Sequence, residues 1–275
     1  MRTTHLVSIL ALGLALAACS SKAPPQATGP ASTGPLTEEQ FKALHALPTP
    51  DPRDLKGSVI DLKGTKAYLS LPAGTGPFPA IVVIHEWWGL NGNVEHWADR
   101  LASAGWAALA VDLYSGTVAT NRDEAMAAMK AVDDTKAAAV IRAGIDFVGT
   151  DPRIKATKKA VIGWCFGGGW SLQAALTNPD LDGAIIYYGQ LELDPAKLGA
   201  IKAKVLGVFG KKDKGIPPEK VAEFEAALKQ AGVSGEIHEY DAEHAFANPS
   251  NPVYDQASAA DAWQHVMAFL AKLRT

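Results

Sequence analysis

Short apolar runs that alternate with helix-like segments constrain this chain more than any other feature of its sequence. AIVVIH at 80–85 and VLGVFG at 205–210 are almost wholly apolar, as is typical of strands buried on both faces. Between such runs, apolar residues recur at helical spacing, for example from Val94 to Leu101. Strands that alternate with helices predict an α/β fold, with a mostly parallel central sheet flanked by helices on both faces.

The composition narrows the class of protein. The 275 residues suffice for one large domain, and the charged fraction of 20% is ordinary for a globular enzyme. The formal charge is −3, and the sequence contains no basic cluster. Because binding to phosphates needs concentrated Lys and Arg, nucleic acid is excluded as the main partner.

The N-terminus has the pattern of a secretory signal peptide. Arg2 precedes an apolar segment that ends in small residues and is too short to span a membrane, which predicts a signal peptide over residues 1–18. LAAC at 16–19 resembles a bacterial lipobox, and this resemblance implies cleavage before Cys19 and lipid attachment to it. We therefore expect a lipoprotein of the bacterial cell envelope, facing the periplasm from the outer membrane in a Gram-negative cell. The alternative is a plain signal that leaves Cys19 unmodified.

The mature chain divides into a tether and a catalytic domain. Residues 20–36 consist mainly of Pro, Ser, Gly and Ala and contain too few large apolar residues to fold. We predict a flexible tether over 19–56, with a short helix within TEEQFKALHAL at 37–47, and a catalytic domain over 57–275.

GWCFGGG at 163–169 identifies the candidate nucleophile. It follows an apolar strand and precedes a helix, as in a nucleophile elbow with cysteine in place of serine. If Cys19 carries lipid, Cys165 has no partner for an internal disulfide, which favours a reactive role over a buried structural one. The backbone amides of Trp87 and Phe166 are candidates for an oxyanion hole.

Two residues that follow later strands complete a candidate triad. Asp213 and His244 come after Cys165 in the chain order nucleophile, acid, histidine. His244 would act as the base, and Asp213 would orient its ring. Alternatively, Asp213 is a solvated turn residue and His244 an ordinary loop histidine. His238 is a poorer candidate because it lies inside a predicted strand.

HEWWG at 85–89 lacks the second histidine of a zinc-binding HExxH motif, so we expect no metal and no cofactor. Glu86 either faces the Cys165 thiol or bridges two loops. Aromatic residues on the motif loops predict an apolar substrate pocket, whereas Trp170 is assigned to the core. The predicted pocket residues are Trp88, Tyr114, Trp164 and Phe246.

Taken together, GWCFGGG, HEWWGLN, VDLYSG, FGKKD and EHAFAN resemble the dienelactone hydrolase family over residues 57–275. The resemblance implies an α/β-hydrolase fold and a Cys-His-Asp triad of Cys165, His244 and Asp213, with Glu86 contacting the thiol. Family members that act on dienelactone hold its carboxylate with two arginines. The corresponding places here hold Ser115-Gly116 and Asn248, which argues against dienelactone as the substrate.

The sequence therefore predicts a hydrolase of small carboxylic esters or lactones that works through a thioester on Cys165, with the membrane as a further partner through lipid on Cys19. The alternative is a non-catalytic envelope lipoprotein of the same fold that binds a small ligand or a partner. A redox-sensing thiol is disfavoured because no second cysteine is available to resolve an oxidised Cys165. The oligomeric state is left open.

Overall fold

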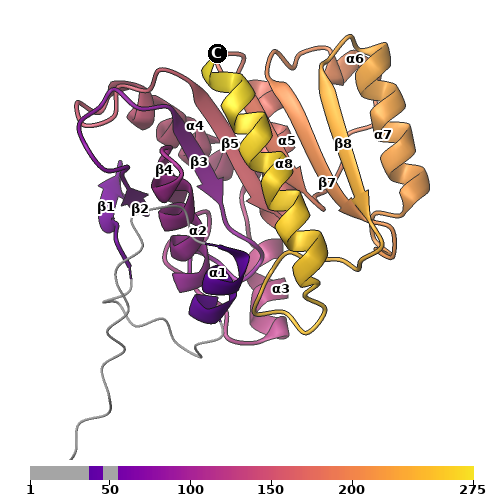
Figure 1. Cartoon of the computed structure of the whole chain (residues 1–275), viewed down its shortest axis with the longest axis horizontal. Helices are drawn as coiled ribbons and strands as arrows, with labels where there is room; N and C mark the ends of the chain where they lie inside the picture. The colour runs from indigo at the N-terminus through magenta and orange to yellow at the C-terminus, as the bar shows by residue number, and fades with distance from the viewer. Residues whose placement is uncertain (1–36, 46–54) are drawn as a thin grey trace, which may run out of the picture. The chain divides into compact units, whose positions relative to one another are not determined.

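The computed structural model describes residues 37–45 and 55–275, built around an eight-stranded sheet (Figure 1). The predicted signal peptide 1–18, the predicted lipidation site Cys19 and most of the predicted tether lie outside the described residues. Within the described part of the chain, no helix is both long enough and apolar enough to cross a membrane.

The strand order across the sheet is β1-β2-β4-β3-β5-β6-β7-β8. Strand β2 pairs antiparallel with β1 and β4, whereas every pair from β4 to β8 is parallel. This arrangement confirms the predicted α/β-hydrolase fold. The strands are β1 (Ser58–Leu62), β2 (Thr65–Ser70), β3 (Ala80–Ile84), β4 (Ala107–Val111), β5 (Lys159–Trp164), β6 (Gly183–Tyr187), β7 (Lys204–Gly210) and β8 (Gly235–Tyr240).

Helices cover both faces of the sheet, as predicted. Because successive strand residues point to opposite faces, Ile81 and Val83 pack with α1, α2 and α8, whereas Val82 and Ile84 pack with α4, α5 and α7. Each face has its own apolar core. The helices are α1 (Glu38–His45), α2 (Gly92–Ser103), α3 (Arg122–Lys130), α4 (Asp134–Thr150), α5 (Phe166–Thr177), α6 (Pro195–Leu198), α7 (Pro218–Gln230) and α8 (Gln256–Arg274).

Helix α1 belongs to the folded unit, although its sequence lies in the predicted tether. Thr37 and Gln40 form a capping box, in which each backbone N–H donates to the other's side chain at 3.0 and 3.2 Å. Phe41 is fully buried, and Glu38 accepts a hydrogen bond from the buried Arg100 guanidinium at 2.7 Å. The folded unit therefore includes residues that precede the predicted domain start at residue 57.

The parallel strands bring the predicted site residues to one edge of the sheet. Glu86, Cys165, Asp213 and His244 each follow the carboxyl end of a different strand, namely β3, β5, β7 and β8. Open α/β sheets form their binding clefts at this edge.

Candidate active site

Cys165 occupies a sharp turn between β5 and α5. Its φ of 55° and ψ of −116° lie in a region that side chains rarely adopt, at a cost of about 1–3 kcal/mol. A Cβ on Gly163 would lie 2.2 Å from the Gly167 carbonyl oxygen, and one on Gly167 would lie 2.3 Å from that of Ile84. Only glycine therefore fits on either side of this turn.

The turn also places Cys165 at the positive end of α5. Cys165 is the N-cap residue, and the Phe166 amide belongs to the first turn, whose N–H groups have no partner within the helix. These amides and the helix dipole favour negative charge on the Cys165 sulfur. Trp87 lies in the turn after β3, which the Gly89 amide closes by donating to the Glu86 carbonyl at 3.2 Å. The oxyanion hole of Trp87 and Phe166 amides stays a prediction.

Asp213 and His244 form a hydrogen-bonded pair. His244 Nδ1 lies 2.6 Å from Asp213 Oδ2. The other carboxylate oxygen accepts hydrogen bonds from the backbone amides of Gly215 and Ile216, at 2.8 and 3.1 Å. Because the Asp213 carboxylate is buried and held at both oxygens, it fixes the orientation of the imidazole. Asp213, in the turn after β7, is therefore a buried hydrogen-bond acceptor and not a solvated turn residue.

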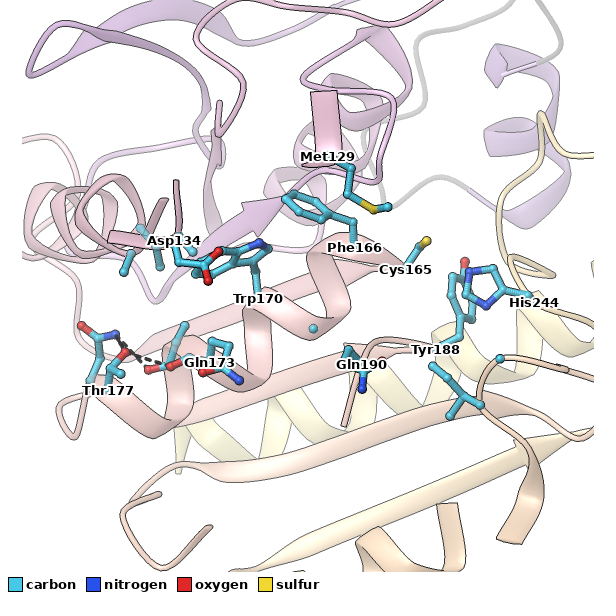
Figure 2. Close-up of a pocket in the computed structure, with 17 residues that line it drawn as sticks. Met129, Asp134, Cys165, Phe166, Trp170, Gln173, Thr177, Tyr188, Gln190 and His244 are labelled. Atoms are coloured by element: carbon cyan, nitrogen blue, oxygen red, sulfur yellow. Dashed lines mark hydrogen bonds between the residues drawn. The ribbon is translucent and has the colours of Figure 1, made fainter. Parts of the chain in front are cut away.

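Figure 2 shows His244 and Cys165 together at one end of a cavity. Burial alone lowers the pKa of His244. The hydrogen bond to Asp213, the neighbouring Cys165 side chain and the negative charges of both groups outweigh burial and raise this pKa to about 10. His244 is therefore an imidazolium at neutral pH, at the same end of the cavity as Cys165.

Glu86 lies beside Cys165 and His244, and its hydrogen-bond partner is the neutral side chain of Asn248. Its Oε2 accepts a hydrogen bond from Asn248 Nδ2 at 2.6 Å, while its Oε1 is buried without a partner among the described residues. Burial raises the pKa of Glu86 to about 7, against the opposing effects of Asn248 and the His244 charge. The charge of Glu86 also interacts with Tyr188, which in turn interacts with Cys165.

A cavity of about 670 Å³ opens beside Cys165 and His244. It follows α5 away from these two residues, with α3 and α4 on its other side (Figure 2). The residues that line it include Met129, Asp134, Ala138, Ile141, Cys165, Phe166, Gly169, Trp170, Gln173, Thr177, Tyr188, Gln190, Ile216 and His244.

The structure corrects the predicted pocket residues. Trp164 is 2% exposed and stacks on Trp97 with ring centroids 4.6 Å apart, in the core on the opposite face of the sheet. Phe246 is fully buried in the same core. Trp88 borders a small separate cavity with Glu86.

Tyr114 packs on Phe166 at 5.4 Å without lining the main cavity. Trp170, assigned to the core from the sequence, is half-buried against the core and also lines the cavity. It lies four residues after Phe166 on α5, so both side chains share one helix face. This four-residue spacing is visible in the sequence and could have placed Trp170 beside Phe166 at the pocket.

Tyr188 is a further site residue that the sequence analysis missed. It follows β6 at the same sheet edge, its ring lies 5.1 Å from that of His244, and its φ of 35° is in the left-handed region. Because the carboxyl ends of parallel strands meet at this edge, the position of the YYG sequence after a predicted strand could have identified Tyr188.

Among the described residues, one group outside the cavity offers three ligand atoms for a metal, all within 4.8 Å: Glu236, His238 and His265. The two imidazole rings are stacked, with centroids 3.6 Å apart and planes 28° from parallel. His238 Nε2 is already paired with Glu236 Oε1 at 2.9 Å. Glu236 is further engaged by Lys272 Nζ at 3.1 Å. The arrangement is that of a surface hydrogen-bond cluster.

Comparisons with known proteins show which sequences and structures this chain resembles. The sequence profile described as "Dienelactone hydrolase family" matches residues 65–273. Protein usf of Aquifex pyrophilus is 31% identical over 219 residues, which cover 76% of this chain and 94% of that protein. A Methylorubrum extorquens protein provisionally named a carboxymethylenebutenolidase is 30% identical over 215 residues, covering 73% and 74% of the two chains. A solved Klebsiella pneumoniae structure, provisionally described as a dienelactone hydrolase, has a TM-score of 0.72 and 26% identity, covering 78% of this chain and 98% of that one.

Proposed function

Because this chain belongs to the dienelactone hydrolase family, we propose that it hydrolyses uncharged carboxylic esters or lactones through a thioester on Cys165. One observation carries the proposal. His244 is bonded to buried Asp213 at 2.6 Å on one nitrogen and lies with Cys165 at the same end of the cavity. A nucleophile, a base and a group that orients the base therefore lie next to one another in space, as covalent catalysis of acyl transfer requires.

The reaction follows from these positions. The Cys165 sulfur attacks the carbonyl carbon, and amides at the start of α5 stabilise the oxyanion. When the tetrahedral intermediate collapses, the bond to the alcohol oxygen breaks and His244 gives that oxygen its proton. Water then attacks the thioester, with His244 accepting a proton from it. The acid leaves, and Cys165 returns to the thiolate.

The charge of the substrate follows from the groups that line the cavity. The name carboxymethylenebutenolidase denotes a lactone that bears a carboxylate. Here Asn248 bonds Glu86, and the described residues that line the cavity include the anion Asp134 but no Lys or Arg. A substrate carboxylate would have no cation to pair with along the cavity, so we propose a neutral substrate.

This charge preference is directly measurable. We expect full-length protein to hydrolyse a neutral butenolide methyl ester at least about tenfold more efficiently, in kcat/KM at the lactone bond, than the matching free carboxylate. Burial of a carboxylate without a hydrogen-bond or charge partner costs about 1–3 kcal/mol or more, which corresponds to at least about this factor. A preference for the free acid would contradict the proposed substrate charge, and absence of turnover on every ester and lactone would contradict the proposed function.

Glu86 gives a pH-dependent prediction for stability. Because its pKa is raised from 4.5 to about 7, the folded state favours protonated Glu86, and stability falls as pH rises through this window. A shift of this size corresponds to up to about 3 kcal/mol. Glu86→Gln imitates the neutral form and keeps an acceptor for Asn248. We expect wild type to lose up to about 3 kcal/mol relative to this variant between pH 5 and 8, measured by urea denaturation. Parallel curves for the two proteins would refute a neutral Glu86.

We also propose that Cys19, which lies outside the described residues, is lipidated after cleavage and anchors the enzyme in the cell envelope. The support is the lipobox-like LAAC at 16–19 behind an apolar signal. We expect a bacterial host fed radiolabelled palmitate to label wild type and not Cys19→Ser, with wild type alone in the membrane fraction. Equal partitioning and no label in either protein would favour a plain signal peptide.

A further inference from the structure

The cavity runs along one face of α5 for the full length of the helix. Cys165, Gly169, Gln173 and Thr177 stand four residues apart, and all four line it. With a rise of about 1.5 Å per residue, the distance from Cys165 to Thr177 along the helix is about 18 Å. We call this cavity the α5 groove.

The walls of the α5 groove near Cys165 are apolar. Phe166 and Trp170 project from α5 (Figure 2), and Ala138 and Ile141 of α4 also line the groove. Beyond these residues the groove opens to solvent, where Gln173 and Thr177 are exposed. An apolar chain could therefore lie between the two helices near the nucleophile, with its far end reaching water.

The far end of the groove offers no free cation for an anionic chain end. Arg142 donates to Asn178 Oδ1 at 3.1 Å, but its guanidinium is also hydrogen-bonded to Asp146 and Asp180. Asp134 contributes a further negative charge to the lining. The groove thus suits an uncharged chain.

The volume of the groove is much larger than a simple lactone requires. At about 30 Å³ for each non-hydrogen atom, a ring of six such atoms occupies less than about 180 Å³. The groove measures about 670 Å³, within the range of sites for much larger ligands. Most of this space has no role in the hydrolysis of a small ring.

The position of His244 decides which half of an ester would enter the groove. Figure 2 shows Cys165 between His244 and the body of the groove. The leaving oxygen must face His244 to receive its proton, so the acyl group extends to the other side. That side is the face of α5.

We propose that the α5 groove binds an extended, uncharged acyl chain, so that the preferred substrates are esters of medium- to long-chain acids rather than small lactones. This inference rests on the proposed function for its chemistry and on the groove for its specificity. C–C bonds of about 1.5 Å at near-tetrahedral angles advance an extended chain by about 1.25 Å per carbon, so about fourteen carbon atoms span the distance of about 18 Å from Cys165 to Thr177.

The first test is the dependence of kcat/KM on acyl length, measured with full-length protein and 4-nitrophenyl acetate, butyrate, octanoate and laurate. Each buried methylene contributes up to about fourfold, so we expect at least about thirtyfold higher kcat/KM for octanoate than for acetate. A flat or falling series would overturn the inference.

Variants localise the effect to the groove. Ala138→Phe places a ring between α4 and α5, and we expect it to lower the octanoate-to-acetate ratio at least tenfold. The control is Ala139→Phe, on the exposed side of the same helix, which should keep the wild-type ratio. Gln173→Trp, at an exposed position on α5, should lower the laurate-to-butyrate ratio even if Ala138→Phe fails to fold. Wild-type ratios in folded groove variants would contradict the proposal.

A binding measurement separates this inference from the proposed function. Calorimetric titration of wild type with 1-butanol, 1-hexanol and 1-octanol needs no turnover. We expect octanol to bind at least about thirtyfold more tightly than butanol, and Gln173→Trp or Ala138→Phe to reduce this ratio. Chain-dependent binding without ester turnover would reject the hydrolase and keep the groove. Equal affinities of the three alcohols would reject the groove, whatever the enzyme hydrolyses.

Discussion

Replacing Cys165 by alanine is expected to lower kcat for ester hydrolysis by at least about 10⁴-fold, the largest effect of any single substitution in this chain. Without the sulfur no thioester forms, and only substrate binding and the oxyanion-stabilising amides remain to accelerate hydrolysis. Alanine leaves the strained turn between Gly163 and Gly167 intact, so the fold should be retained. The measurement is single-turnover hydrolysis of a 4-nitrophenyl ester by full-length wild type and variant.

Cys165→Ser is the matched control, because it keeps a nucleophile of similar size in the same turn. His244 and Asp213 are equally placed to serve a hydroxyl, so we expect low but measurable activity that is clearly above that of the alanine variant. If Cys165→Ala retained the wild-type rate while remaining folded, hydrolysis would be occurring elsewhere, and the non-catalytic binding protein would become the better account of this fold.

The second large effect is expected at the base. His244→Gln should lower kcat about 10³- to 10⁴-fold, because no group remains to transfer the proton to the leaving oxygen. Asp213→Asn should lower kcat by less than His244→Gln does. It should also change the dependence of kcat/KM on pH. The hydrogen bond that His244 donates to the Asp213 carboxylate is the foremost effect raising the pKa of His244 to about 10.

The direction in which pH changes activity follows from the raised pKa of His244. Because the folded-state pKa of His244 is raised, its ion pairs are fully present below about pH 6.5 and are lost as pH rises through about 10. The wild-type kcat/KM profile should therefore decline near pH 10, and Asp213→Asn should move this decline toward neutral pH. Asp241→Asn, at an exposed acid bonded to Lys212, is the control that should leave the profile in place. An unchanged profile in Asp213→Asn would contradict the assigned pairing.

Much of the fold was predictable from local sequence patterns. Buried parallel strands require continuous apolar runs, and these stand out at 80–85 and 205–210. The turn at Cys165 was predictable for a related reason: the backbones around Gly163 and Gly167 approach too closely for any side chain, so the glycines mark the geometry. Chain order then placed Asp213 and His244 after later strands of the same sheet.

The pocket was less predictable because it depends on which face each aromatic residue occupies. Trp164 and Trp170 both adjoin the elbow motif, but Trp164 is the last residue of β5 and points to the core under α2. Trp170 belongs to α5, is half-buried against the core of the other face, and lines the groove. A change of one or two positions around a strand–helix junction moves a side chain between the two layers.

Contacts between distant segments were beyond the reach of the sequence. The hydrogen bond of Asn248 to Glu86 joins residues 162 positions apart, and it determines that Glu86 is held by a neutral partner rather than a cation. The wall of the groove formed by α4 was also unpredictable. Nothing in the sequence around Ala138 indicates that α4 packs beside α5. The burial of Phe41 likewise shows that a helix in a predicted tether can belong to the core.

The central claim is that Cys165 carries the acyl group, and intact-protein mass spectrometry with peptide mapping tests it most directly. Full-length wild type is mixed with 4-nitrophenyl octanoate, quenched in acid within milliseconds to seconds, and digested. We predict a mass increase equal to one octanoyl group, located on the peptide that contains Cys165, appearing and decaying at the rate of turnover and absent from Cys165→Ala. Turnover with an adduct on another residue, or an adduct of equal size in Cys165→Ala, would contradict the account.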